Sequence, residues 1–210
     1  MKEFITIQEN VQAEIVEKKS KFIANLIYVE TVEEAEEAIK NIKKKYFDAK
    51  HNCIAYRVAE DNQIIERSSD DGEPSGTAGA PMLTILQKND LANVVVIVTR
   101  YFGGILLGTG GLVRTYSDSL LKAISLSKLC KKCLGVEMEV VLEYSNYENF
   151  KYYCKNKEIS IVDVQYAEEI VCKIELEDDK RRQLLEDFET KKVMIQNLKD
   201  LSQKYISKSI

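Results

Sequence analysis

Tryptophan is absent from this chain of 210 residues, and histidine occurs once, proline twice and cysteine five times. A single histidine excludes the two-metal cages of histidines and carboxylates that serve in metal-assisted hydrolysis. Five cysteines are an odd number and too scattered for a disulfide framework, so we expect reduced thiols in a reducing compartment. No apolar run approaches the roughly 20 residues that span a bilayer, and the first ten residues lack a signal pattern. We therefore expect a cytoplasmic protein that does not enter a membrane.

An excess of basic charge is also missing. The formal net charge is −4; residues 1–134 are balanced, and residues 135–210 carry the whole acidic excess. Non-specific binding to a nucleic acid duplex depends mainly on neutralising phosphates, and it usually requires a net basic domain. The composition therefore gives no sign of general duplex binding, although it leaves room for a local basic patch.

Glycine and proline are confined to one part of the chain. Eight of the nine glycines and both prolines fall between Gly72 and Gly111, and nothing after Gly135 is glycine or proline. Because these residues interrupt helices and strands, the last part should be nearly all regular structure. We place a domain boundary near residues 133–135, which gives a first domain over 1–134 and a second over 135–210.

Hydrophobic periodicity outlines the first domain. Thr31 is expected to cap a helix, with Glu34 completing a capping box. Five β-branched residues at 94–98 indicate a strand that is buried on both faces. The remaining expected elements are a strand pair at 11–16 and 21–29, a second pair at 53–58 and 63–67 with its turn at 60–62, a short helix at 77–87 and an amphipathic helix at 112–127.

The second domain has a cleaner pattern. We expect a half-buried strand from Val136, a helix capped by Ser145 and Glu148, and two further strands. A helix over 178–190 and a last strand over 193–198 complete the order βαββαβ, which is the ferredoxin-like arrangement. The expected fold class is therefore α+β, with an α/β domain followed by a ferredoxin-like domain.

Residues 68–79 form the first unusual run, because turn-forming residues, hydroxyls and three carboxylates occur together. Ser69, Asp70, Asp71 and Glu73 are the candidate functional side chains. The run is consistent with a metal-binding loop or a polar grip on a ligand. It is equally consistent with a solvated turn that caps the following helix.

Residues 99–114 form the second run, which leaves a buried strand, passes through five glycines and enters a helix. Glycine lets backbone N–H groups approach a ligand, and a helix N-terminus favours anions. The candidate binding residues are Gly103, Gly104, Gly108, Gly110 and Gly111, with phosphate or carboxylate pairing from Arg100 and Arg114. A P-loop is excluded because a threonine stands where it needs lysine, and the dinucleotide fingerprint lacks its third glycine. Alternatively, the glycines permit close packing of strand and helix.

His51 and a Cys-x-x-Cys pair also carry potential chemistry. His51 begins an expected strand and either acts as a base or donor near the glycine segment or is a structural, hydrogen-bonded residue. Cys130 and Cys133 would need two more ligands to hold zinc, and none is evident. We interpret the pair as incidental and expect neither a metal nor a cofactor.

Four motifs together resemble one family closely. Residues 18–24, 51–57, 69–79 and 99–111 resemble, in order and spacing, the signature of the IMPACT/YigZ family. The resemblance implies a ribosomal protein S5 domain 2-like fold for the first domain. For the second it implies a likeness to the last domain of elongation factor G. It also implies a link to translation, because the eukaryotic relatives regulate translation during amino-acid starvation.

These observations favour a non-enzymatic module that binds RNA, the ribosome or a translation-related protein through residues 99–114 and 68–79. A small-molecule enzyme that uses the acidic loop and His51 is the alternative, although no nucleophile–base pair is evident. A third possibility is a protein-binding regulator whose ferredoxin-like domain serves as an interaction or dimerisation surface.

Overall fold

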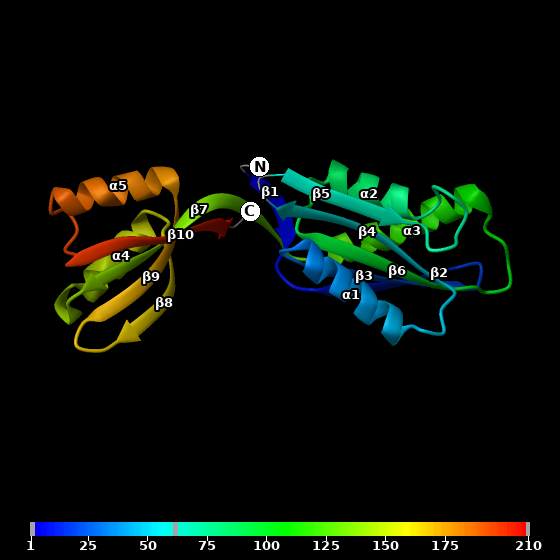
Figure 1. Ribbon diagram of the computed structural model, residues 1–210, viewed down its shortest axis with the longest axis horizontal. Helices are drawn as coiled ribbons and strands as arrows, with labels where there is room; N and C mark the ends of the chain where they lie inside the picture. The colour runs from blue at the N-terminus through cyan, green and yellow to red at the C-terminus, as the bar shows by residue number, and fades with distance from the viewer. Residues whose placement is uncertain (1–2, 61–62, 209–210) are drawn as a thin grey trace. The chain divides into compact units, whose positions relative to one another are not determined.

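A computed structural model describes residues 3–60 and 63–208 of the chain. Helices and antiparallel strands are mixed, which confirms the α+β class. The chain forms two compact units, the first running from Glu3 to Lys131 and the second beginning at Lys132 (Figure 1). Among the described residues, no helix is long and apolar enough to cross a membrane. Two residues of the turn expected at 60–62 lie outside the described ranges.

The first unit is built on a five-stranded antiparallel sheet in the order β2-β3-β6-β4-β5. Both expected strand pairs are present; three of the four strands extend further than their apolar pattern, and β3 is shifted by one residue toward the N-terminus. A short strand at the N-terminus was not expected. The strands of this unit are β1 (Glu3–Ile7), β2 (Val11–Glu17), β3 (Ser20–Tyr28), β4 (His51–Glu60), β5 (Gln63–Ser69) and β6 (Val94–Tyr101).

Helices cover both faces of this sheet: α1 (Val32–Lys45) lies on one face, and α2 (Gly79–Lys88) and α3 (Gly108–Leu126) lie on the other (Figure 1). The hydroxyl of Thr31 accepts the backbone N–H of Glu34, so the expected cap is confirmed. The Glu34 carboxylate accepts the backbone N–H of Glu30, one residue before the cap.

The central strand β6 explains the run of β-branched residues. Val94, Val96 and Val98 pack in the core beneath α2 and α3. Val95 and Ile97 pack in the core beneath α1. Because successive side chains of a strand point to opposite faces, a strand between two helical layers must be apolar at every position. The prediction of burial on both faces is confirmed.

The second unit has the expected ferredoxin-like topology. Its sheet has the order β10-β7-β9-β8, and one core joins the sheet to both helices. Strand β9 alternates buried and half-buried residues along its whole length. The elements are β7 (Leu129–Leu142), a 3-10 turn (Tyr144–Asn146), α4 (Tyr147–Asn156), β8 (Ser160–Tyr166), β9 (Ile170–Glu177), α5 (Asp178–Glu189) and β10 (Asn197–Lys208).

The capping box expected at Ser145 is wrong. A 3-10 turn closes first, with the N–H of Asn146 donating to the carbonyl of Glu143, so the α-helix begins only at Tyr147. Ser145 lies inside that turn, and its hydroxyl contacts the Glu143 carboxylate at 3.4 Å. No side chain caps the helix, because the 3-10 turn continues directly into it.

The last strand was also misplaced, since it starts at Asn197 rather than at residue 193. The segment before it completes the end of α5: the N–H groups of Lys192 and Val193 both donate to the carbonyl of Asp187. Val193 is buried in the core of this unit. Its apolar character therefore reflects loop packing and not strand pairing.

Candidate functional site

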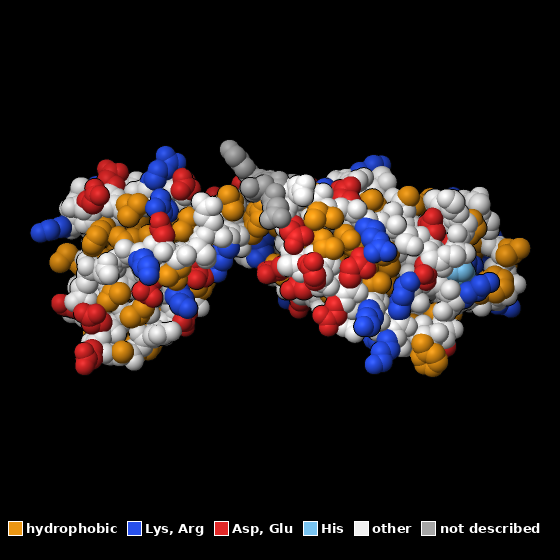
Figure 2. All heavy atoms as spheres, in the orientation of Figure 1, with side chains coloured by type: hydrophobic (Ala, Val, Ile, Leu, Met, Phe, Trp, Pro, Cys, Tyr) orange, Lys and Arg blue, Asp and Glu red, His pale blue; other side chains and the backbone are white. Residues whose placement is uncertain are grey.

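A cavity of about 420 Å³ opens at the end of the first unit's sheet, where β4 begins and β6 ends. His51 and Arg100 are direct partners across these two strands, which brings their segments together. The volume falls within the range of roughly 300–1,000 Å³ that is usual for ligand sites. The lining comes from three segments, namely Lys50 and His51, then Gly72, Glu73 and Pro74, then Arg100, Phe102, Leu106, Leu107, Gly108, Thr109 and Leu112. Figure 2 shows histidine, basic and hydrophobic atoms grouped at this end.

A buried ion pair forms one wall of the cavity. Arg100 Nη1 donates to Glu73 Oε1 at 2.6 Å, and the hydroxyl of Tyr116 donates to the same oxygen at 2.9 Å. Burial, followed by the neighbouring Cys53 and Glu73, raises the pKa of Tyr116, so its hydroxyl stays protonated and donates. Glu73 therefore balances the charge of Arg100 inside the protein, and Arg100 is not a free surface cation.

The guanidinium of Arg100 still has unused hydrogen-bonding capacity. Its Cζ lies 5.4 Å from the ring centroid of Phe22 and 5.5 Å from that of Phe102. Its Nε is buried and has no acceptor among the described residues. Leaving a buried donor unpaired costs about 1–3 kcal/mol. An acceptor from a bound partner would remove that cost.

In the acidic loop, Asp70 is a scaffold. Its carboxylate accepts the backbone N–H groups of Gly76, Ala78 and Gly79 at 2.7–2.9 Å. Burial alone would raise the pKa of Asp70, but these three donors outweigh it and lower the pKa. The Sγ of Cys53 donates to the Asp70 carbonyl, which ties the loop to β4. Asp70 thus holds the loop that carries Glu73 in place.

Asp71 is also engaged within the protein. Its carboxylate pairs with Lys43 and accepts the backbone N–H of Asn52, and its own N–H donates to the Ser69 hydroxyl at 3.3 Å. His51 Nδ1 lies 2.9 Å from the Asp71 carbonyl. A carbonyl oxygen can only accept, so Nδ1 carries the proton. His51 is therefore hydrogen-bonded to the loop and buried.

These contacts bear on the alternative of a small-molecule enzyme. All three carboxylates of the loop already hold structural hydrogen bonds or ion pairs. General base catalysis needs a carboxylate or imidazole within reach of a substrate proton. In the described part of the chain, no three side chains of histidine, cysteine, aspartate or glutamate converge as a metal site. In this structure the three carboxylates hold the loop and its neighbouring segments in place.

The five glycines of residues 99–114 differ in the structural constraint, if any, that requires glycine at each position. A Cβ on Gly103 would lie 2.0 Å from the backbone of Lys19, so close packing of the chain forbids any side chain there. Gly104 and Gly108 have φ of +87° and +72°, which L side chains rarely adopt. Gly111 would press a Cβ against Leu107 at 3.1 Å. Gly110 has neither constraint, because nothing lies within 4 Å of its Cβ position.

Helix α3 begins at Gly108, four residues earlier than the apolar pattern indicated. The pattern missed this turn because three of its four residues are glycines, which carry no hydrophobic signal. No side chain caps the helix, and its first turn has no acidic residue. Arg114, expected to pair with an anion, is exposed and lies outside the cavity lining. The structure therefore separates the two arginines: Arg100 lines the cavity and Arg114 does not.

Apolar cavity residues were missed by the sequence interpretation. Phe102 and Leu106 are 53% and 82% exposed, and Ile105 beside them is also exposed. We call these three residues the cavity rim. Contiguous exposed apolar surface on a soluble protein is a common mark of a binding site. Lys50 was missed because nothing in its local sequence distinguishes it from other surface lysines.

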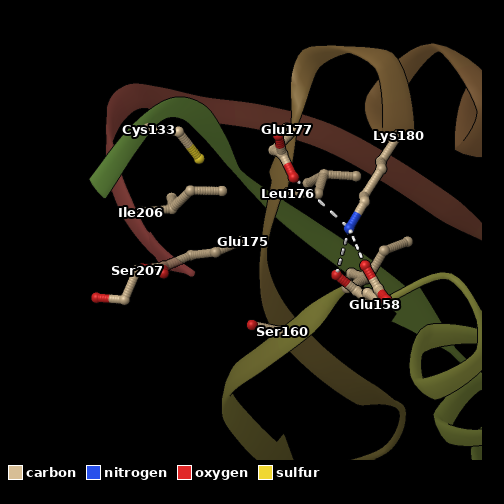
Figure 3. A pocket seen from close by; sticks show the side chains of 10 residues that line it. Cys133, Glu158, Ser160, Glu175, Leu176, Glu177, Lys180, Ile206 and Ser207 are labelled. Atoms are coloured by element: carbon tan, nitrogen blue, oxygen red, sulfur yellow. Dashed lines mark hydrogen bonds and ion pairs between the residues drawn. The ribbon is translucent and has the colours of Figure 1, made fainter. Parts of the chain in front are cut away.

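A second cavity of about 450 Å³ lies within the second unit (Figure 3). Figure 3 shows the ammonium of Lys180 between the carboxylates of Glu158 and Glu177. Glu175, which also lines it, pairs with Lys204 at 2.7 Å. Its charged groups are therefore matched by internal partners. The Cys130–Cys133 pair lies on strand β7, and both thiols are buried.

Comparison with known proteins identifies the family of the first unit. A family model described as the Impact N-terminal domain matches residues 18–124, just over half of the chain. The chain belongs to the IMPACT family. The matched range contains every residue that lines the cavity of the first unit.

Relatives in the IMPACT family match across both units. IMPACT family member YvyE of Bacillus subtilis is 39% identical over 167 residues, which is 80% of this chain and 76% of the relative. IMPACT family member YigZ of Escherichia coli is 33% identical over 160 residues, covering 76% of this chain and 78% of the relative. A crystal structure described as that of a hypothetical protein aligns with a TM-score of 0.63 and 30% identity. That alignment covers 96% of this chain and 98% of the other.

Proposed function

We propose that this IMPACT-family protein is a translation-related regulatory protein that binds the ribosome through the cavity of its first unit. The observation that carries the proposal is the exposed cavity rim beside a buried arginine. Phe102, Ile105 and Leu106 contribute little to the core, and Phe102 and Leu106 line a cavity whose Arg100 has an Nε without an acceptor. Apolar contact area around a few polar groups is the usual composition of a binding site.

Family membership and charge support the choice of partner. The resemblance to the IMPACT/YigZ family implies a role in translation, and the matched region contains the cavity. The first domain has no excess of basic residues, so contact with the phosphate backbone alone would be weak. A ribosome-bound protein surface or a locally presented RNA group suits the cavity better than a bare duplex.

Co-sedimentation with ribosomes of Bacillus subtilis at low salt tests the proposal. We expect the wild-type chain to pellet with ribosomes and Leu106→Asp to lose at least tenfold in binding, because the new charge opposes apolar contact. Leu121→Asp is the matched control, since Leu121 is also exposed on this unit. It lies twelve residues beyond Thr109, about 18 Å along α3. Equal binding by Leu106→Asp and the wild type would refute the assigned site.

A further inference from the structure

The N-terminus of α3 offers unused donors to the cavity. Gly108 and Thr109 line it, and the helix starts there without a side-chain cap or an acidic residue. Among the described residues, the N–H groups of Gly108, Thr109 and Gly110 have no acceptor outside the helix. The first N–H groups of an α-helix have no partner within it either. These donors, with the helix dipole, favour a bound anion.

Arg100 is a second and independent indication of a ligand. The side chain is more than nine-tenths buried, lines the cavity and keeps an Nε–H without an acceptor. Glu73 occupies only its Nη1. Of the two aromatic rings near the guanidinium, Phe22 is buried and Phe102 is half exposed, so Phe102 is the one with room to move and let a ligand oxygen reach Nε. Two elements, the end of β6 and the start of α3, therefore present donors to one space.

Much of the lining of the same cavity is apolar. Pro74 and Leu112 lie in the lining with the leucines of the loop before α3 and with Phe102. A ligand that fills the cavity must therefore carry an apolar body next to its anionic group. Inorganic anions alone would leave this surface uncovered.

Charge distinguishes between carboxylate and phosphate. Lys50 and Arg100 are the basic residues of the lining and Glu73 is its acidic residue, so the formal charge is one positive with His51 neutral. A phosphate monoester carries about −1.5 to −2 at neutral pH. A carboxylate carries −1, which matches the lining.

We propose that the cavity captures the C-terminus of a partner protein. The terminal carboxylate accepts the N–H groups at the start of α3 and the Nε–H of Arg100, and the last apolar side chains lie against the leucines and Phe102. Capture of a C-terminal carboxylate by free backbone N–H groups beside an apolar pocket is a known mode of peptide recognition. This inference rests on the proposed function, because it assigns the same cavity to a protein chain end presented on the ribosome.

Peptide titration followed by amide NMR tests the inference. The probe is a pool of hexapeptides whose last three positions carry leucine, isoleucine, valine or phenylalanine. It is added to the full chain in free-acid form and, separately, as C-terminal amides. We expect the free acids to shift the amide resonances of residues 108–111 and to bind at least tenfold more tightly than the amides. Equal binding of acids and amides, or tighter binding of adenosine monophosphate, would overturn the inference.

Gly110→Asp provides the sharpest variant. An aspartate at this position, next to Thr109 of the lining, adds a negative charge to the first turn of α3, which opposes a ligand carboxylate there and favours the helix. We expect at least a tenfold loss of peptide binding without any fall in melting temperature. Leu121→Asp adds the same charge elsewhere on the helix and should bind as the wild type does. If Gly110→Asp is folded and binds the free acids normally, the carboxylate does not bind at α3.

The two proposals fail in different ways. If the free acids bind but ribosomes do not pellet the chain, the cavity recognises chain ends and the translational role is wrong. If ribosome binding depends on Leu106 but the acids and amides bind alike, the role stands and the carboxylate assignment is wrong.

Discussion

Arg100 and Glu73 form a 2.6 Å ion pair in which the side chains are 7% and 3% exposed. The two residues lie on different elements: Arg100 is on β6, and Glu73 is in the loop before α2. The pair therefore fixes the acidic loop against the sheet. Because both groups have lost their water, removing one partner should affect stability more than removing a surface pair would.

We predict that Glu73→Gln lowers the free energy of unfolding by about 3–5 kcal/mol, because Arg100 is left as an uncompensated buried charge. Urea denaturation measures the loss. The double variant Arg100→Met/Glu73→Gln should lose less than the sum of the two single variants, since it buries no unpaired charge. Strictly additive losses would show that the two side chains do not interact.

Asp70→Asn should loosen residues 76–79. An amide cannot match a carboxylate as acceptor of three N–H groups, and hydrogen bonds to charged groups contribute about 1.5–3 kcal/mol each. Hydrogen exchange at the amides of Gly76, Ala78 and Gly79 should accelerate. Asp118→Asn, an exposed position on α3, is the control and should leave these amides unchanged.

The same carboxylate predicts a pH dependence of stability. Backbone donors hold the folded-state pKa of Asp70 below its ordinary value, so the folded state favours the ionised form. The contribution is complete above the unfolded pKa of about 3.9 and is lost as the pH falls through the lower folded pKa. The difference in unfolding free energy between wild type and Asp70→Asn should therefore shrink between pH 5 and pH 2. A constant difference over that range would contradict the assignment.

Two glycines of the same segment should respond in opposite directions to alanine. Gly103→Ala forces a Cβ to within 2.0 Å of the Lys19 backbone and should destabilise by more than 2 kcal/mol, on the order of an overpacked core. Gly110→Ala meets open space in a helix and should stabilise by about 0.5–1 kcal/mol. Thermal denaturation of both variants gives the comparison. Destabilisation by Gly110→Ala would mean that the fold itself requires glycine there.

Cysteine reactivity should be negligible in the folded chain. Burial raises the pKa of both the Cys53 and Cys154 thiols to about 12, so only about one in ten thousand is thiolate at pH 8. All five cysteines are buried. A disulfide reagent such as DTNB should titrate five thiols in denaturant and react very slowly without it. Rapid reaction of one native thiol would identify an accessible cysteine.

The local hydrophobic pattern of the sequence predicted many of the helices and strands. Apolar residues alternate along β9 and recur at helical spacing along α1, because each element buries one face. Such periodicity can be read from the sequence alone. The element order of the second unit followed from the same signals. The predictions were wrong where the conformation of a segment depends on a turn or on contacts with residues distant in sequence. Val193 is apolar because it packs in a loop, and Ser145 resembles a cap but lies within a 3-10 turn.

Site residues were harder to predict than elements. The juxtaposition of residues 68–79 and 99–114 was suggested by the family resemblance and not by composition or spacing. The pairing of Arg100 with Glu73 could not be predicted, because 27 residues separate the two and no periodicity relates them. For the same reason the sequence presented Arg100 and Arg114 as equivalent. Burial distinguishes them, and burial at this edge depends on how β4, β6 and α3 assemble.

The contact between Gly103 and Lys19 also determines how this segment tolerates substitution. In a library that randomises residues 103–111, selection for folding alone should retain only glycine at position 103 and accept many residues at position 110. Selection for partner binding should narrow position 110 as well. Comparing the two selections would separate the residues that build the loop from those that expose its backbone, although both are glycine in the wild-type chain.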